Sequence, residues 1–252
     1  METNPVLEAI RRRRTIREFS SKKIPEQLLY ELLDAANTAP SGFNLQPWHF
    51  IIVRDQDLKE ILKHVALGQK QVVHAPCVVV FAADPDAWKT QYDKVLAQSV
   101  EHGALARDQA LFNRKMVNRL FSTDPCGLFG LLKRVIIPFQ RLRKPVPNVV
   151  TSFAEAKSYV QTQTAFAAAT FLIAASGAGL GACPMEGFDE ERLKKLLAVP
   201  TRMTIPLIIA LGYPLEGEEI KPQLRLPLRE KLSVDLFPNK LSRAVKPPAA
   251  AG

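Results

Sequence analysis

Hydrophobic residues recur at helical spacing in several parts of the chain. Leucines follow the 3.6-residue period after Pro25, and Leu7 and Ile10 share one face after an Asn4-Pro5 pair typical of a helix start. Weaker amphipathic patterns predict helices over residues 58–65 and 189–197.

Continuous apolar runs bounded by polar or turn residues predict strands over residues 50–53, 77–83 and 203–211. The run 77–83 lies between Pro76 and Asp84, as in a strand that is buried on both faces. Helices therefore alternate with strands, and we expect helical layers around one sheet, an α+β fold.

The longest helix is predicted to begin at Ser152-Phe153-Ala154-Glu155, which fits a capping box, and to run to about Gly177. Its second half is apolar almost all round, as in a helix at the centre of a large core or in a subunit interface. The glycines of residues 177–181 have the wrong spacing for a dinucleotide fingerprint, so we expect a helix C-terminus with left-handed glycines there.

The length favours a single domain over residues 1–240, with a helical insertion at about residues 85–150 and a disordered, Pro- and Ala-rich tail at residues 241–252. The insertion is too hydrophobic for a disordered linker. The N-terminus lacks the apolar core of a secretory signal, and the apolar stretch 165–180 is shorter than the roughly 20 residues of a membrane span.

The composition, with 47% hydrophobic and 23% charged residues, is that of a globular protein with its own core. The three cysteines, Cys77, Cys126 and Cys183, have neither CxxC spacing nor a Cys/His ligand pattern. We therefore expect no disulfide framework, no metal site and a cytoplasmic location, with Cys77 as a buried inert thiol.

The net charge of +9 is concentrated between Glu101 and Pro145, where nine Lys/Arg face three Asp/Glu. This segment has no helix-turn-helix, zinc-finger or RNA-binding pattern, so we expect no nucleic-acid partner. Its part from Gly127 to Lys144 is predicted to be a lid. That lid would serve as dimer packing and a roof over the substrate, or as an amphipathic helix on an anionic membrane.

The clearest candidate for chemistry is the polar loop before the first strand. It carries Pro40, Gly42 and the side chains of Ser41, Asn44 and Gln46, which donate and accept hydrogen bonds but are not strong acids, bases or nucleophiles. That set suits binding of a planar heterocycle, although a surface turn would contain many of the same residues. His49 follows Trp48 into the strand, and we expect a structural role for it.

A second candidate is the cluster Arg13-Arg14-Thr15-Ile16-Arg17. Three guanidinium groups with a hydroxyl between them could bind a phosphate monoester, because the guanidinium fork matches phosphate geometry. The alternative is a solvated basic helix end, which the helix dipole also favours.

Four separated segments resemble motifs of the nitroreductase family, the dimeric FMN-dependent oxidoreductases. Residues 13–19 resemble "RRSxRxF" with Thr15 for Ser, and residues 40–48 resemble "PSxxNxQPW". Residues 184–188 resemble "PxEGF", and residues 221–228 resemble "KxRxPL". The resemblance spans residues 5–232 and implies a mostly antiparallel sheet flanked by helices in an entwined homodimer.

The resemblance implies which residues bind FMN. Those holding its phosphate and pyrimidine edge are Arg13, Arg14, Thr15 and Arg17. Those touching the FMN bound mainly by the other subunit are Pro40, Ser41, Gly42 and Asn44, with Gln46 and Trp48 as braces. The residues expected over the isoalloxazine ring are Pro184, Met185, Glu186 and Gly187. A backbone N–H near Glu186 is expected to point at flavin N5. Those reaching the phosphate are Arg225 and Gln223, or Lys221 in place of Gln223. A further flavin contact is expected at residues 68–71.

The function implied is transfer of a hydride from NAD(P)H, the co-substrate, through flavin N5 to a nitroaromatic, quinone or similar small oxidant in ping-pong order. No side chain is expected to act as catalytic acid or base, and Arg17 is expected to stabilise the anionic reduced flavin. The alternatives are a dehydrogenase, a reductive dehalogenase, a flavin-fragmenting enzyme or a non-catalytic flavin-binding module.

Overall fold

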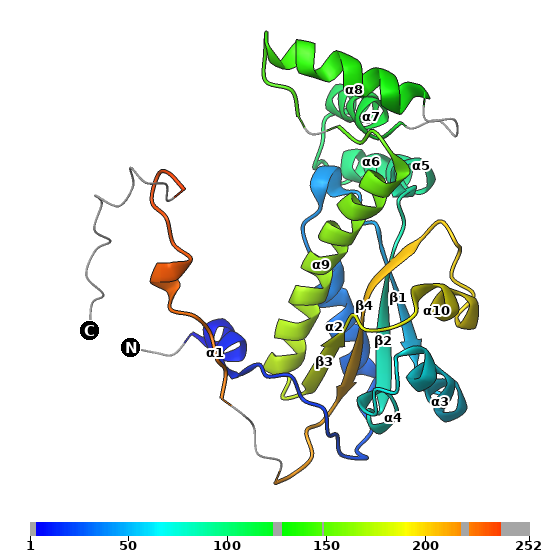
Figure 1. The fold of residues 1–252 in the computed structure, drawn as a ribbon, viewed down its shortest axis with the longest axis vertical. Coiled ribbons are helices and arrows are strands. Elements are labelled where there is room, and N and C mark those ends of the chain that lie inside the picture. Colours follow the sequence, from blue (N-terminus) through cyan, green and yellow to red (C-terminus); the bar gives the residue numbers. More distant parts are fainter. Residues whose placement is uncertain (1–3, 123–127, 148, 218–221, 238–252) are drawn as a thin grey trace. The chain divides into compact units, whose positions relative to one another are not determined.

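Four strands form one antiparallel sheet in the computed structural model (Figure 1), which describes residues 4–122, 128–147, 149–217 and 222–237. The strands are β1 (Trp48–Val53), β2 (Cys77–Ala83), β3 (Gly181–Met185) and β4 (Thr204–Gly212), in the order β1-β2-β4-β3. All three neighbouring pairs are antiparallel, with Ile52 opposite Val79, Val80 opposite Ile208 and Cys183 opposite Ala210. The α+β class and the antiparallel sheet are thereby confirmed. The sheet belongs to the first of two compact units, residues 1–218; the second comprises residues 219–252.

Strand β2 is fully buried because helices cover both faces of the sheet (Figure 1). On one face α2 (Glu26–Asn37) and α9 (Phe153–Gly177) pack against Val79, Phe81 and Ile209. On the other, α3 (Gln56–Val65), α4 (Gln71–His74) and α10 (Glu190–Leu196) pack against Val78, Val80 and Ile208. Alternate residues of one strand thus enter two cores, which explains its uninterrupted apolar sequence. The predicted burial of Cys77 is confirmed, and burial raises the pKa of its thiol to about 11.

Strand β3 was not predicted. Of the three glycines in residues 177–181, Gly177 ends α9, Gly179 has a left-handed φ of 76°, and Gly181 begins the strand. The expectation of a helix C-terminus was therefore right for the first part and wrong for the last. Pro184 lies in β3, an edge strand of the sheet, where a residue without an N–H is tolerated.

The predicted helix starts are largely confirmed at the level of single hydrogen bonds. The Asn4 side chain accepts from the N–H of Val6 and of Leu7 at the start of α1 (Pro5–Arg12). The Ser152 side chain accepts from the N–H of Glu155 at 3.2 Å. The Glu155 carboxylate, however, accepts from the N–H of Thr151 at 2.7 Å and not from that of Ser152, so only half of the capping box forms.

Four further helices gather at one end of the first unit (Figure 1): α5 (Ala87–Thr90), α6 (Tyr92–Glu101), α7 (Arg107–Phe121) and α8 (Leu128–Arg141). Tyr92, Val117 and Phe121 share a separate apolar cluster with Leu45 and Ala156. The second unit contains a short 3₁₀ turn, Leu228–Glu230, and its described side chains are exposed. Cys126 and the tail predicted at 241–252 lie outside the described residues. Within the described parts of the chain, the helices are too short or too polar to cross a bilayer.

Candidate functional site

The segment after α1, residues 13–20, runs extended along the edge of the sheet; we call it the arm. The N–H of Ile16 donates to the carbonyl of Ala182 at 3.2 Å, and the N–H of Ser20 donates to that of Tyr213 at 2.9 Å. Packing is tight, since a Cβ placed on Gly181 would lie 2.8 Å from the Cβ of Ile16. The arm thus carries the predicted arginines to strand β3.

The arginines of the arm are not equivalent. Arg14 folds back, donating from Nη1 to the carbonyls of Arg11 at 2.6 Å and Arg13 at 2.9 Å. Arg12, just before the arm, donates to the carbonyl of Ser176 at the end of α9. For Arg13 and Arg17, no hydrogen bond from the guanidinium and no ion pair is found within the described residues. These two therefore offer donors to an anion, whereas Arg14 is largely occupied by the backbone.

Next to the arm, the turn after β3 meets residues 68–71. Gln69 donates from Nε2 to the carbonyl of Gly187 at 2.8 Å, and Gln71 donates to the sulfur of Met185 at 3.2 Å. Burial raises the pKa of the Cys183 thiol, while the charge of Arg17 and a hydrogen bond with Gln71 act in the opposite direction. Residues 68–71 are thus tied to the end of β3 and to the turn after it.

Three distant segments thus form what we call the cradle: Arg13, Thr15 and Arg17 of the arm, Gln69 and Gln71, and Met185 to Gly187. Thr15 and Glu186 are exposed, and the N–H groups of Glu186 and Gly187 donate no backbone hydrogen bond within the described residues. One buried polar atom, Nε of Arg14, also lacks a partner there. Cations for a phosphate beside amide and N–H donors for a heterocycle make a donor set that fits FMN.

The polar loop, residues 40–46, has an unusual backbone. Phe43, Asn44 and Gln46 have positive φ angles of 56°, 57° and 46°, a region that non-glycine residues rarely adopt. The loop is held from outside, since Gln91 donates from Nε2 to the carbonyls of Leu45 at 2.8 Å and Gln46 at 2.7 Å. Strained backbone that the surroundings fix in place is typical of functional sites.

Helix α9 fixes the same loop by its side chains. The N–H of Gly42 donates to Oε1 of Gln163 at 2.8 Å. The hydroxyl of Tyr159 occupies the space where a Cβ on residue 42 would lie, so the loop requires glycine at this position. Sequence reasoning missed Tyr159, Gln163 and Gln91. Tyr159 and Gln163 lie among other polar residues in the first half of α9, and Gln91 precedes α6, so no local pattern singles them out.

The remaining predicted loop residues have internal partners. Ser41 Oγ accepts from the N–H of Gln46 at 3.0 Å, and Gln46 Nε2 donates to Oδ1 of Asn44 at 3.0 Å. Pro40 and Asn44 are exposed, and buried Trp48 donates to Asn37 at 2.9 Å. His49 is exposed on β1. Gln46 is thus bonded within the loop and Trp48 joins the start of β1 to the end of α2, while their role as braces stays a prediction.

The cradle and the polar loop are separated within one chain. The loop contacts α9 at residues 159 and 163, whereas α1, which leads into the arm, is tied to α9 through Ser176. At a rise of 1.5 Å per residue, 13 residues of helix span about 20 Å. A groove of about 620 Å³ lies between α8 and the first half of α9, with Ile137, Tyr159 and Thr162 in its lining.

Two predicted residues lie in the second unit. Gln223 and Arg225 are exposed, and Arg225 donates to the carbonyl of Leu224 at 2.7 Å. Their contact with the phosphate stays a prediction, and Lys221 lies outside the described residues. In the described ranges, no group of three or more His, Cys, Asp or Glu side chains is arranged to hold a metal ion.

Comparison with known proteins gives consistent matches. The model of the nitroreductase family matches residues 10–124 and 135–213. A protein named NADH dehydrogenase from Thermus thermophilus is 34% identical over 90% of this chain and 95% of its own length. A 4-nitrobenzoate reductase from a Nocardioides species is 25% identical over 83% of this chain and 82% of its own length. The FMN complex of a candidate nitroreductase from Exiguobacterium sibiricum superposes with a TM-score of 0.68 at 19% identity, covering 92% and 98% of the two chains.

Proposed function

The chain belongs to the nitroreductase family, and from this premise we propose that it is an FMN-dependent NAD(P)H oxidoreductase that reduces a nitroaromatic, a quinone or a similar small oxidant. The observation that carries the proposal is the cradle, where the arm, residues 68–71 and the turn after β3 converge. The names of the 4-nitrobenzoate reductase and of the FMN complex support the substrate class and the cofactor.

The cradle residues divide the work of holding the cofactor. Arg13, Thr15 and Arg17 would hold the phosphate and the pyrimidine edge, with Arg14 fixing the arm in place. The ring would be oriented by Gln69, Gln71 and the N–H groups near Glu186. It would lie against Pro184, Met185 and Gly187. When bound, FMN supplies the hydride chemistry, taking a hydride from NAD(P)H and passing it to the oxidant in ping-pong order. The fixed charge of Arg17 favours negative charge in the cradle.

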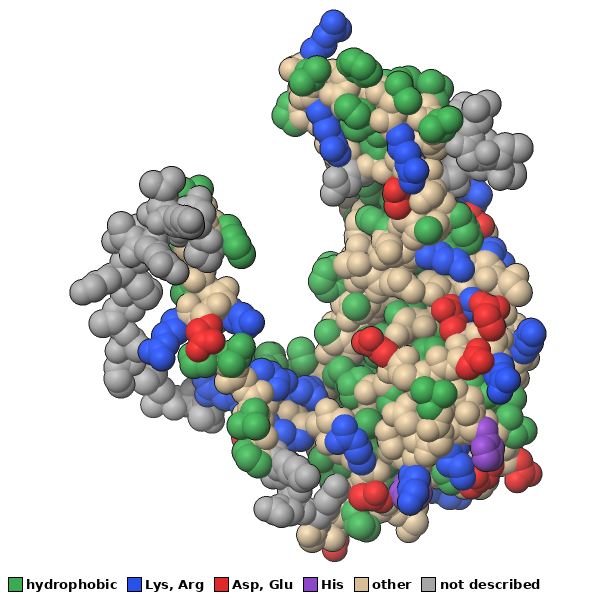
Figure 2. Space-filling model, in the orientation of Figure 1, with side chains coloured by type: hydrophobic (Ala, Val, Ile, Leu, Met, Phe, Trp, Pro, Cys, Tyr) green, Lys and Arg blue, Asp and Glu red, His purple; other side chains and the backbone are tan. Residues whose placement is uncertain are grey.

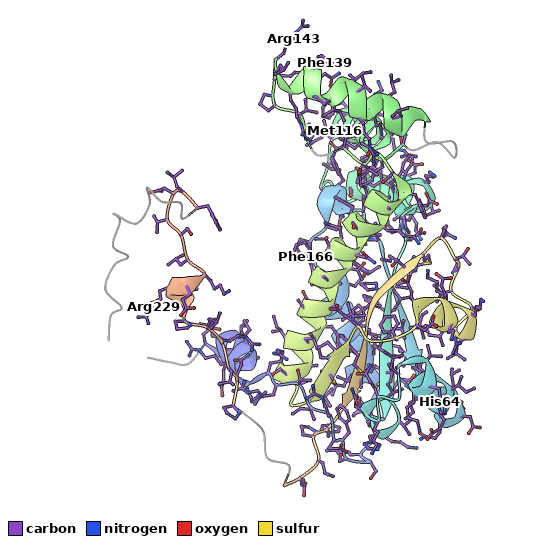
Figure 3. All side chains as sticks on the ribbon, viewed as in Figure 1. His64, Met116, Phe139, Arg143, Phe166 and Arg229 are labelled. Atoms are coloured by element: carbon purple, nitrogen blue, oxygen red, sulfur yellow. The ribbon has the colours of Figure 1, made fainter. Side chains whose placement is uncertain are left out.

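The site is completed in a homodimer. One chain keeps the polar loop about 20 Å from the attachment of α1 to α9, so Pro40, Ser41, Gly42 and Asn44 would contact the FMN of the other subunit. Apolar side chains are left exposed on the helices that a partner would cover: Val6, Leu7 and Ile10 on α1 at 58%, 48% and 42%, and Phe166 on α9 at 48% (Figure 3). A partner helix packed on these residues would bury them.

The test is an absorption spectrum of the purified full-length protein, recorded before and after addition of NADH or NADPH. We expect a yellow protein that is bleached by the nicotinamide and recoloured by a nitroarene or a quinone, and that elutes as a dimer. A colourless protein without affinity for FMN would refute the proposal and favour a non-catalytic module. Reduction by NAD(P)H without turnover of either oxidant would point to another redox reaction on this scaffold.

A further inference from the structure

Helix α8 presents two different faces. Its inner face is fixed to the rest of the first unit by Lys133, whose Nζ donates to the carbonyls of Ser122 at 2.6 Å and Val150 at 3.1 Å. Gly130 is buried against the carbonyl of Thr151, so close that no side chain would fit. These contacts set the rotation of the helix about its axis.

The outer face of α8 is a row of large apolar side chains at positions i, i+1, i+4, i+5 and i+8, which lie on one side of a helix. Their exposed fractions are 59%, 52%, 55%, 40% and 68% for Leu131, Leu132, Val135, Ile136 and Phe139. Phe139 lies on the outer side of α8, at the end of the first unit (Figure 3). Leu142, just beyond the helix, is 84% exposed.

The surroundings of this face are basic. The sequence between Asp124 and Glu155 has five Lys/Arg and no acidic residue. Three of these cations, Arg141, Arg143 and Lys144, are exposed at the C-terminal end of α8. Arg143 projects beyond the helix near Phe139 (Figure 3), and lysine and arginine side chains are interspersed with the apolar patch in the space-filling view (Figure 2).

The family model covers only part of this surface. The family model matches residues 10–124 and 135–213 and leaves out the residues between them, which include the first half of α8. The apolar row begins in that unmatched stretch, at Leu131. Val135, Ile136 and Phe139 lie within the matched residues, as do the three exposed cations.

We propose that α8 docks this protein on the surface of an anionic lipid bilayer. The row from Leu131 to Phe139 would enter the boundary between headgroups and acyl chains, and Arg141, Arg143 and Lys144 would meet the lipid phosphates. The chemistry favours this occupant over a second copy of the same face. An isologous contact would bring two acid-free, basic surfaces together, which like-charge repulsion opposes.

The experiment is co-sedimentation of the full-length holoprotein with vesicles of phosphatidylcholine alone or mixed with phosphatidylglycerol. We expect sedimentation with the anionic vesicles and its loss at high salt. In the double variant Val135→Ser/Phe139→Ser, the affinity for anionic vesicles should fall by about tenfold or more. The matched control Ile61→Ser/Leu67→Ser, at sites 50% and 75% exposed around the end of α3, should bind like the parent protein.

A second pair of variants separates electrostatic from apolar attraction. Arg141→Gln/Arg143→Gln should weaken binding to anionic vesicles severalfold, whereas Arg54→Gln/Arg192→Gln should not. Three results would each overturn the proposal: parent protein that stays in the supernatant with both vesicle types, binding that survives Val135→Ser/Phe139→Ser, or a change of oligomeric mass in that variant without lipid, which would assign the face to contacts between copies.

Discussion

The two ends of helix α9 hold functional segments by different means. Near Ser176 the arm is held by backbone pairing with β3 and with the residues after β4, and the guanidinium groups of Arg13 and Arg17 make no hydrogen bond within the described residues. Near Gln163 the polar loop is held by uncharged side chains and by left-handed backbone at Phe43 and Asn44.

The two ends of α9 therefore present different parts of the candidate site. Backbone pairing leaves the side chains of Arg13 and Arg17 available, so the arm end supplies charge. The loop end supplies shape, because Gly42 has its position fixed by Tyr159 and Gln163. Their attachment points on α9 lie about 20 Å apart along the helix, and the proposed homodimer would join charge and shape in one site.

The largest effect is expected at the loop end. In Gly42→Ala the methyl group would collide with the Tyr159 hydroxyl and displace the loop, lowering kcat/KM with a nitroarene about 100-fold. Adding Tyr159→Phe removes the oxygen and should restore part of the activity. Gly177→Ala is the control, because its Cβ would lie at an ordinary 3.9 Å from Ala9. Unchanged turnover in Gly42→Ala would show that the loop's shape is unimportant.

At the arm end, the arginines should differ in their effect on FMN. Arg17→Gln removes a cation that has no partner among the described residues and should weaken FMN binding about 10- to 100-fold in a fluorescence titration. Arg14→Gln should have a smaller effect, since that guanidinium is bound to the carbonyls of Arg11 and Arg13. Equal losses in both variants would contradict the distinction between them. Arg54→Gln, which breaks an exposed pair with Glu26 at 3.5 Å, is the control.

The packing of the arm on β3 can be tested without cofactor. Gly181→Ala would place a methyl group 2.8 Å from the Cβ of Ile16 and should lower the free energy of unfolding by about 1–3 kcal/mol. Amide exchange at Ile16 should accelerate while the polar loop keeps its exchange rates. Equal acceleration at both ends would mean that they are not independent.

The smallest effects are expected at the start of α9, on the loop side. Ser152→Ala removes the N-cap and should lower the free energy of unfolding by about 1 kcal/mol.

The pH dependence of Glu155 gives a companion test. The N–H of Thr151, more than any other group, holds the pKa of Glu155 below its ordinary value of 4.5. Its stabilising contribution is thus present above that value and is lost as pH falls through the lower folded pKa. The stability difference between parent and Glu155→Gln, followed by thermal unfolding, should be constant near neutrality and shrink in acid. A constant difference at all pH values would exclude the ionised carboxylate as its source.

Local patterns were enough for much of the fold. The caps at Asn4 and Ser152, the period of α2 and the apolar run of β2 depend on neighbouring residues or on burial on both faces, and each appeared where it was expected. Strand β3 was missed because Gly181 and Pro184 have low strand propensity. It forms through pairing with β4 and the arm, which are remote in sequence.

By itself, the sequence determined the family, the α+β class and the segments that supply the candidate site, because motifs and periodicity are written in consecutive residues. Only the tertiary structure decided that Arg14 is occupied while Arg17 is available, that Gln69 and Gln71 stand beside Met185 and Gly187, and that Tyr159 fixes Gly42. The hydrogen bonds of Arg14 are local, but the other contacts join residues that are far apart along the chain. They follow from how helices pack on the sheet, which no short stretch of sequence encodes.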